Sequence, residues 1–213
     1  GVVRLLAPNN SFTAGVQVKY ARTLQVMSLA DNGTPCSIGA GGGFPPNGMT
    51  AINLGSTDSQ RGGTLAYIGT NDTSCNRQLT VLGLGSLSSG TMLNNSPNNS
   101  SLHFSDAGLM NFNSGEINCT LNLGGSAEAT NIFDESIPNT ANASSGVVGL
   151  AVIGSIWQLT GYHSYTGSTL VTNGTLLLEG NIGPAADLTV QKGGVLGGTG
   201  TINANVSVFT SGT

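Results

Sequence analysis

The sequence predicts an all-β fold, a parallel β-helix or β-solenoid with coils of about 20 residues and glycine-rich corners. Three observations lead to this prediction. The chain of 213 residues contains 33 glycines. Short apolar–polar–apolar triplets recur along it, and near the C-terminus they return at nearly constant intervals. Only 8% of the residues are charged whereas 38% are hydrophobic, so a core can form beneath a surface of hydroxyl and amide groups.

Each triplet is expected to be a short strand with one face in the core, because successive side chains of a strand point to opposite faces. No stretch shows the 3.6-residue periodicity of a helix. Eight triplets follow the alternating pattern: residues 16–18, 24–26, 52–54, 79–81, 102–104, 121–123, 188–190 and 206–208.

The coil period is visible near the C-terminus. Gly-Thr-Leu at 174–176 returns as Gly-Val-Leu at 194–196, and Val190 returns as Val208. Both intervals are close to a period of about 20 residues, and stacked coils of this length share a core that no coil could form alone. Glycine supplies positive φ at the corners, as do the Asn-Gly pairs at 32–33, 47–48 and 173–174. We therefore expect a single solenoid of about nine to eleven coils over residues 1–213, with irregular coils and loops in 1–156 and a repeat-like segment in 157–213.

Three segments interrupt the pattern and are expected to leave the coils as loops. Residues 39–48 are rich in glycine and proline, residues 94–101 form a polar run of Asn and Ser, and residues 131–145 contain Asp134, Glu135 and Pro138. Loops that leave a solenoid coil are where binding features usually sit.

From Trp157 onward the residues fall into a distinctive spacing. The motif consists of Trp157, Leu159, Gly161, Tyr165, Thr166, Gly167, Thr169, Val171, Gly174 and Leu176. In this spacing the segment resembles the passenger-associated transport repeat of bacterial autotransporter proteins. Residues 193–202 resemble the continuation of that repeat, and 61–123 show a weaker likeness to the upstream coils. The resemblance implies a right-handed parallel β-helix passenger domain, secreted across the outer membrane and displayed on the cell surface, often with an adhesive or structural role.

The three cysteines, Cys36, Cys75 and Cys119, lack the CxxC spacing of a zinc site. Their separations of 39 and 44 residues are each about two coils long, which is too far for a disulfide. We expect buried free thiols, while one internal bridge or an intermolecular pairing stays open. No metal site and no cofactor are predicted.

A β-helix can also be a polysaccharide lyase or hydrolase, so we searched for catalytic groups. Asp134 and Glu135 are the only adjacent acidic pair, but strand geometry points neighbouring side chains to opposite faces, which favours a solvated loop. His103 should face solvent from the middle of its triplet, and His163 lies between two tyrosines without a nearby nucleophile. No catalytic residue is therefore predicted.

Aromatic side chains and asparagines offer two further possibilities. Trp157, Tyr162 and Tyr165 can stack on sugar rings, although packing in the core is the expected role of Trp157. Ten asparagines begin the sequon Asn-X-Ser/Thr: Asn9, Asn32, Asn71, Asn94, Asn98, Asn99, Asn118, Asn142, Asn173 and Asn205. Many sequons arise by chance in a chain so rich in Asn, Ser and Thr, so glycosylation stays open.

Charge and end structure indicate the partners. Six basic and ten acidic residues give a net charge of −4 with no basic stripe, so nucleic acid is not an expected partner. Residues 2–6 and 206–209 are strand-like, poor in charge and without a capping helix. We therefore expect other copies of this chain, or the rest of a longer polypeptide, to dock at the solenoid ends. Glycans or a host surface are further candidates, and the chain reads as a segment of something longer.

Together these observations predict an extracellular, non-enzymatic β-solenoid of a bacterial surface protein, associated with the outer membrane. It would act as a stalk, an adhesin or a self-associating fibre subunit. The alternative is a carbohydrate-active enzyme, a polysaccharide lyase or hydrolase, on the same fold.

Overall fold

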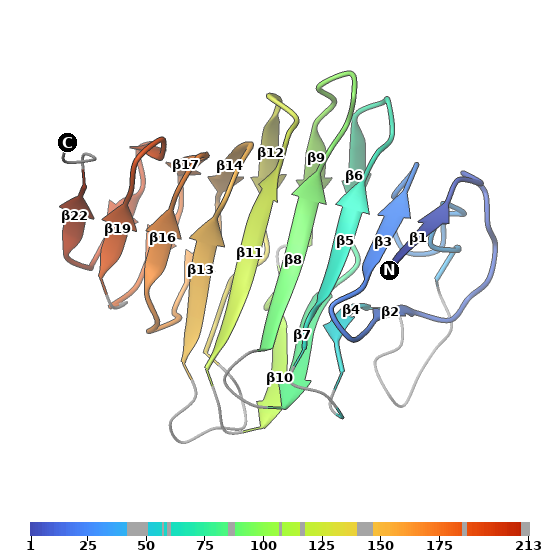
Figure 1. Cartoon of the computed structure of the whole chain (residues 1–213), viewed down its shortest axis with the longest axis horizontal. Helices are drawn as coiled ribbons and strands as arrows, with labels where there is room; N and C mark the ends of the chain where they lie inside the picture. Colours follow the sequence, from blue (N-terminus) through green and yellow to red (C-terminus); the bar gives the residue numbers. More distant parts are fainter. Residues whose placement is uncertain are drawn as a thin grey trace.

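The computed structural model describes residues 1–41, 51–56, 58, 61–84, 88–106, 108–115, 118–139, 147–184 and 187–209. These residues form 22 strands and no helix, which confirms the predicted all-β solenoid. The described chain therefore contains no helix that could cross a membrane. The strands stack along one long axis, with the N-terminus near one end and the C-terminus at the other (Figure 1).

The strands are distributed over three faces of the solenoid, and every strand pair is parallel. The nine-stranded sheet contains β1 (Val2–Leu5), β3 (Thr23–Val26), β5 (Gly63–Tyr67), β8 (Ser88–Asn94), β11 (Cys119–Gly125), β13 (Val148–Val152), β16 (Thr169–Val171), β19 (Leu188–Val190) and β22 (Val206–Val208). The six-stranded sheet contains β6 (Thr73–Cys75), β9 (Leu102–Phe104), β12 (Thr130–Phe133), β14 (Ile156–Leu159), β17 (Thr175–Leu178) and β20 (Val195–Gly197).

The third face is divided into two sheets. Four strands form its N-terminal part: β2 (Val16–Val18), β4 (Ile52–Gly55), β7 (Leu79–Leu84) and β10 (Asn111–Gly115). Three short strands form its C-terminal part: β15 (Tyr162–His163), β18 (Asn181–Ile182) and β21 (Thr201–Ile202). In Figure 1 the nine-stranded sheet points upward in front, the chain returns behind it, and successive coils advance to the left. This path is right-handed, as parallel crossover connections nearly always are.

All eight predicted triplets lie in strands, and their inward side chains stack into columns. One column runs without a break through the nine-stranded sheet: Val3, Leu24, Leu65, Met92, Leu123, Val152, Val171, Val190 and Val208. Its members from Leu24 to Val190 are buried, whereas Val3 and Val208, in the two edge strands, are exposed because none of the described coils covers them. Burial of each such side chain contributes about 1.5–3 kcal/mol.

Coil length varies along the solenoid. The predicted period of about 20 residues is correct for the coil from β1 to β3 and for the three coils from β13 to β22, as the spacing of their register partners shows. It is wrong for the four coils between β3 and β13, each of which takes roughly 27 to 41 residues. The longest of them runs from Leu24 to Leu65. Because the sheet register continues through all four, the additional residues must lie outside the nine-stranded sheet.

The predicted loops are only partly correct. Asn94 ends β8 and is fully buried, and residues 131–133 belong to β12. Residues 95–101 and 134–139 do connect strands, whereas residues 42–48, including the Asn-Gly pair at 47–48, and residues 140–145 lie outside the described part. Gly33 and Asn173 have φ of 90° and 51°, so the other two Asn-Gly corners have the expected positive φ.

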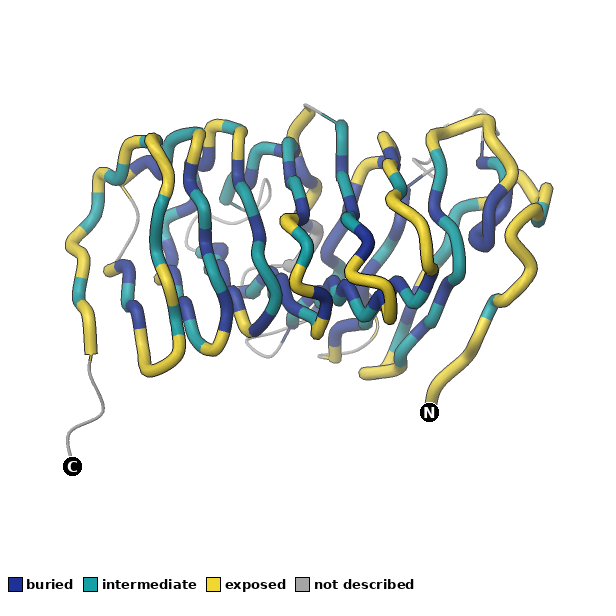
Figure 2. The backbone as a smooth tube through the Cα atoms, turned by 90° about the horizontal axis from the view of Figure 1, so that it is seen from above, coloured by how far each residue is buried: buried dark blue, intermediate teal, exposed yellow. Residues whose placement is uncertain are grey.

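One end of the six-stranded sheet is covered by an irregular loop, whereas the prediction of uncapped ends concerned residues 2–6 and 206–209, at the edges of the nine-stranded sheet. Residues 28–41, here called the cap loop, pack beside β6, and Asp31 Oδ1 accepts a hydrogen bond from the Asn76 backbone N–H (2.9 Å). The Arg77 guanidinium donates to four cap-loop carbonyl oxygens, those of Thr34, Ile38, Gly39 and Ala40. In the part of the chain that the structure describes, no further strand lies beside the outer strands β1 and β22 of the nine-stranded sheet. Figure 2 shows exposed chain at both of these ends and buried chain between them.

Candidate functional site at the polar edge

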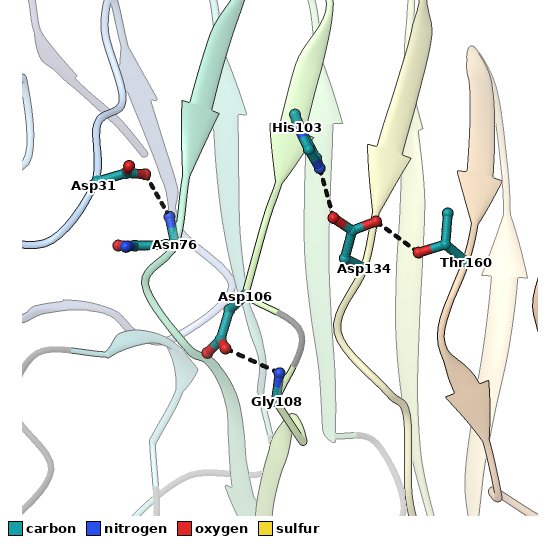
Figure 3. Close-up of polar contacts among 7 residues, drawn as sticks. All are labelled: Asp31, Asn76, His103, Asp106, Gly108, Asp134 and Thr160. Carbon is teal, nitrogen blue, oxygen red and sulfur yellow. Dashed lines mark hydrogen bonds and ion pairs between the residues drawn. The ribbon is translucent and has the colours of Figure 1, made fainter.

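A row of polar side chains lies along the carboxyl end of the six-stranded sheet, with His103 inside β9 and Asp31 in the cap loop (Figure 3). We call it the polar edge and define it by Asp31, Asn76, His103, Asp106, Asp134 and Thr160. Because the strands of this sheet are parallel and in register, residues that follow equivalent strand positions lie beside one another in successive coils. The fold thus gathers residues that are distant in sequence.

Asp134 is the centre of the polar edge. Its Oδ2 lies 2.7 Å from His103 Nε2, and its Oδ1 accepts a hydrogen bond from Thr160 Oγ1 at 2.6 Å. The three residues come from three successive coils. The side chains of His103 and Asp134 are 36% and 25% exposed, so the contact is solvent-screened and contributes at most about 1 kcal/mol. His103 is partly exposed as expected, but the sequence did not reveal its partner.

The other acidic groups of the polar edge are engaged by nearby backbone. Asp106 Oδ1 accepts a hydrogen bond from the Gly108 N–H (2.9 Å), and Asp31 holds the cap loop as described above. Within the described residues, no three His, Cys, Asp or Glu side chains gather as metal ligands would. The polar edge can therefore present hydrogen-bonding groups to a partner, but it offers no assembled metal centre among these residues.

Glu135 lies on the other side of the chain from Asp134 and is fully buried. The Leu79 backbone N–H donates to its carboxyl oxygens at 3.1 and 3.2 Å. Burial raises the pKa of this carboxyl to about 9, so it is protonated at neutral pH. The opposite orientation of the two acids is as predicted, whereas the solvated loop is wrong for Glu135. A glycosidase needs two carboxyls on the same substrate, and this pair cannot supply them.

His163 is also fully buried. The Ile137 N–H donates to its Nδ1 at 3.2 Å, which places the imidazole proton on Nε2. Nε2 has no hydrogen-bond partner in the described structure. Burial lowers the pKa of His163 to about 4, so the ring is neutral at physiological pH, and it is not accessible from solvent.

None of the three cysteines is disulfide-bonded, and all three are buried. Cys75 lies in β6, in the coil that directly follows the long coil containing Cys36, so these two are one coil apart rather than the predicted two. Burial raises the pKa of the Cys75 thiol to about 12. A thiol with so high a pKa is a poor nucleophile and a poor metal ligand.

The residues of the autotransporter-like motif build coils. Trp157 is fully buried in β14 and donates from Nε1 to the Gly124 carbonyl (3.3 Å), while Tyr165 is buried with its hydroxyl 2.6 Å from Thr169 Oγ1. Leu159, Val171 and Leu176 are core residues, and the Thr166 backbone N–H donates to Asn139 Oδ1. Buried Trp157 and Tyr165 cannot stack on a sugar, whereas Tyr162 is 58% exposed.

The three motif glycines lie where the preceding coil comes very close. A Cβ at Gly161, Gly167 or Gly174 would approach that coil's backbone to 2.9, 2.4 and 2.8 Å respectively. Only glycine fits such contacts without a shift of the chain. All ten motif positions thus have a place in the coils, and none of them joins the polar edge.

Sequence reasoning missed a buried asparagine ladder. Asn94 Nδ2 donates to Asn131 Oδ1 (2.6 Å), and Asn131 Nδ2 donates to the Ile156 carbonyl in the next coil (3.0 Å). The ladder satisfies polar backbone at the corner between the nine-stranded and six-stranded sheets. The positions of Asn94 and Asn131 immediately beside apolar strand residues were the only available signal.

The fold defines the described part of the chain as a parallel β-solenoid that carries the polar edge along its six-stranded sheet. Over 86 residues, or 40% of the chain, it is 38% identical to the adhesin BmaC autotransporter of Brucella suis biovar 1 (strain 1330). The matched stretch spans 2% of that protein's length. No protein-family model and no solved structure matches the chain.

Proposed function

We propose that this chain is a segment of a bacterial autotransporter passenger, displayed at the cell surface, with an adhesive or structural and non-enzymatic role. The observation that carries the proposal is the 38% identity to an autotransporter described as an adhesin. The right-handed solenoid and the motif from Trp157 to Leu176 agree with it.

The surface chemistry supports a binding role over catalysis. The described polar edge combines partly exposed hydrogen-bonding groups from several coils, while Glu135 and His163 are locked inside the core. An extended row of neutral and acidic groups can contact a glycan or a host surface by many weak hydrogen bonds, which suits adhesion. We place the adhesive surface at this edge.

Surface display tests the adhesive role. The chain is fused ahead of a transport barrel in a non-adherent bacterium, its exposure is checked by protease treatment of intact cells, and adherence to cultured cells is counted. We expect more adherence than with the barrel alone, and a reduction when Asp134→Ala and Thr160→Ala are combined. A displayed, folded chain that adheres no better than the barrel would contradict the adhesive role and leave the structural one.

A separate assay addresses catalysis. The purified chain is incubated with pectin- and mannan-type polymers, and reducing ends and unsaturated products are measured. We expect no products. Turnover that disappears in Asp134→Asn would overturn the non-enzymatic proposal.

We further propose that the solenoid ends bind another coil, from a longer polypeptide or from another copy of this chain. The exposed edges of β1 and β22 offer unpaired backbone groups beside the apolar side chains Val3 and Val208. Strand addition would pair these groups and bury the apolar column that now ends there.

A further inference from the structure

The sequons are more numerous than composition explains. The chain holds 22 asparagines and 46 serines and threonines among 213 residues, so random order would give about five sequons, half of the ten present. An excess of this kind is expected if asparagine side chains are used as acceptors. Sequence alone does not tell which of them can be reached.

The structure separates reachable sequons from an unreachable one. Of the nine sequon asparagines in the described ranges, eight are exposed: Asn9, Asn32, Asn71, Asn98, Asn99, Asn118, Asn173 and Asn205. Asn94 is fully buried, and its Nδ2 already donates to Asn131 Oδ1 and to the Ser100 carbonyl. Asn142 lies outside the described residues.

Four of the exposed acceptors share one edge. Asn71, Asn98, Asn99 and Asn173 lie in the connections that leave the nine-stranded sheet for the six-stranded sheet. The connections after β5 and β8 rise above the ends of the neighbouring strands at the top of Figure 1. A long connection that stands away from the coils gives a transferase access to the asparagine amide.

The first two of these connections are held against each other. Asp72 Oδ1 accepts from the Ser101 N–H (2.7 Å), and Asn98 Nδ2 lies 3.5 Å from the Thr70 carbonyl. The Tyr67 hydroxyl donates to the Asn71 carbonyl (2.5 Å), which fixes that turn. Asn71 and the 98–99 pair are thus presented side by side from neighbouring coils on a defined surface.

We propose that this edge is an N-glycosylation site, with Asn71 and the 98–99 pair as its main acceptors. The donor is a sugar whose anomeric carbon is bonded to a diphosphate, carried on a nucleoside or on a lipid. The asparagine Nδ2 forms a bond to the anomeric carbon while the carbon–oxygen bond to the diphosphate breaks. The diphosphate leaves with the electron pair, and a base of the transferase takes the Nδ2 proton. No oxidant or reductant is needed.

The proposal does not depend on adhesion, and it gives the weakly charged surface a source of hydration. Only 16 of 213 residues are charged, so charge repulsion does little to keep copies apart. Sugars along this edge would hydrate it, whereas the nine-stranded sheet would remain unglycosylated.

The test is peptide mass mapping of the protein isolated from the cells that naturally produce it. We expect whole-sugar mass increments on peptides containing Asn71 and residues 98–99, and none on Asn94. Single-sugar steps would indicate a nucleoside-linked donor, and one oligosaccharide block a lipid-linked donor. Unmodified protein, or sugar at Asn94, would overturn the proposal.

Variants of the hydroxyl residue give the matched control. Thr73→Ala destroys the Asn71 sequon and should remove its increment completely, whereas Thr73→Ser keeps the sequon and the increment. Thr73 Oγ1 also donates to the Leu29 carbonyl (2.6 Å), so circular dichroism must show that both variants fold. Asn71→Gln serves as a second loss variant that leaves Thr73 intact. An increment that persists in Asn71→Gln contradicts the assignment.

Discussion

At the residue scale, the core of this solenoid contains two ionisable groups that are uncharged at neutral pH, Glu135 and His163. Glu135 keeps its proton because burial raises its pKa to about 9, and His163 lacks a second proton because burial lowers its pKa to about 4. Each group links folding to pH, because its proton affinity differs between the folded and the unfolded chain. Their effects have opposite signs.

The raised pKa of Glu135 predicts that the folded chain loses stability at alkaline pH. Its folded pKa of about 9 exceeds the ordinary 4.5, so its stabilising contribution is complete at low pH and is lost as pH rises through 9. His163 contributes fully above pH 6.5 and loses its contribution as pH falls through 4. The two slopes therefore oppose each other between pH 4.5 and 6.5. Between pH 6.5 and 9 only Glu135 of these two groups affects stability, and the free energy of unfolding should fall by about 1.4 kcal/mol per pH unit. Above pH 9 the raised pKa of the Cys75 thiol adds a decline of the same sign.

Urea unfolding at pH 7 and pH 8.5 measures this slope. Glu135→Gln keeps an acceptor for the Leu79 N–H but cannot ionise, so its free energy of unfolding should be nearly constant over this range. An equal slope in the wild type and in Glu135→Gln would contradict the assignment.

Trp157 predicts a large stability loss. It is fully buried and donates to the Gly124 carbonyl, so Trp157→Ala leaves a cavity and should cost about 3–5 kcal/mol. The neighbouring Gln158 is only partly buried in the same strand, and Gln158→Ala should change stability by less than about 0.5 kcal/mol. Thermal unfolding followed by circular dichroism compares the two, and equal midpoints would refute the core role of Trp157.

At the element scale, the strands and two of the Asn-Gly corners were predictable, whereas the lengths of the coils between them were not. The alternation of apolar and polar residues in a triplet such as residues 121–123 predicts a strand, and every such triplet lies in a strand. The long coil after β3 could not be predicted, because its extra length resides in the cap loop and in residues outside the described part. Burial of Ser37 and Arg77 there depends on backbone contacts that leave no pattern in the sequence.

Two adjacent glycines, Gly197 and Gly198, provide a test of the close backbone contact at the corner between β20 and β21. Gly198 has φ of 108°, and a Cβ there would lie 2.0 Å from the Leu178 carbonyl oxygen. Gly198→Ala should therefore cost at least about 1–3 kcal/mol. At Gly197 a Cβ meets only the flexible Leu177 side chain at 3.3 Å, so Gly197→Ala should leave stability unchanged or slightly higher. Chemical denaturation of both variants measures the difference, and similar losses would disprove the corner argument.

At the scale of the whole molecule, the solenoid was predictable but its polar edge was not. Period and composition indicate stacked coils, whereas the contact of His103 with Asp134 joins residues 31 positions apart in a coil of irregular length. Without the true coil lengths, the sequence cannot show which polar residues become neighbours. The opposite orientation of Asp134 and Glu135 was predictable because it depends on local alternation alone.

End-to-end association is expected for the isolated chain at high concentration. Val208 belongs to the inward column of β22 but is 69% exposed, and an inward charge blocks strand addition. Val208→Lys should therefore abolish association, whereas Ser207→Lys adds the same charge outside the column and should preserve most of it. Sedimentation velocity over a concentration series measures both. A wild-type chain that remains monomeric throughout would rule out the proposed end contact.

The unbroken column from Val3 to Val208 means that the number of coils sets the length of the solenoid. Neighbouring strands lie about 4.8 Å apart, so the eight steps of the nine-stranded sheet span about 38 Å. The short coil from Val190 to Val208 and the long coil from Leu24 to Leu65 each lengthen the solenoid by one inter-strand spacing. Insertions at corners can thus diversify what the surface displays while the reach of the rod stays constant, and only the gain or loss of a whole coil changes how far it extends.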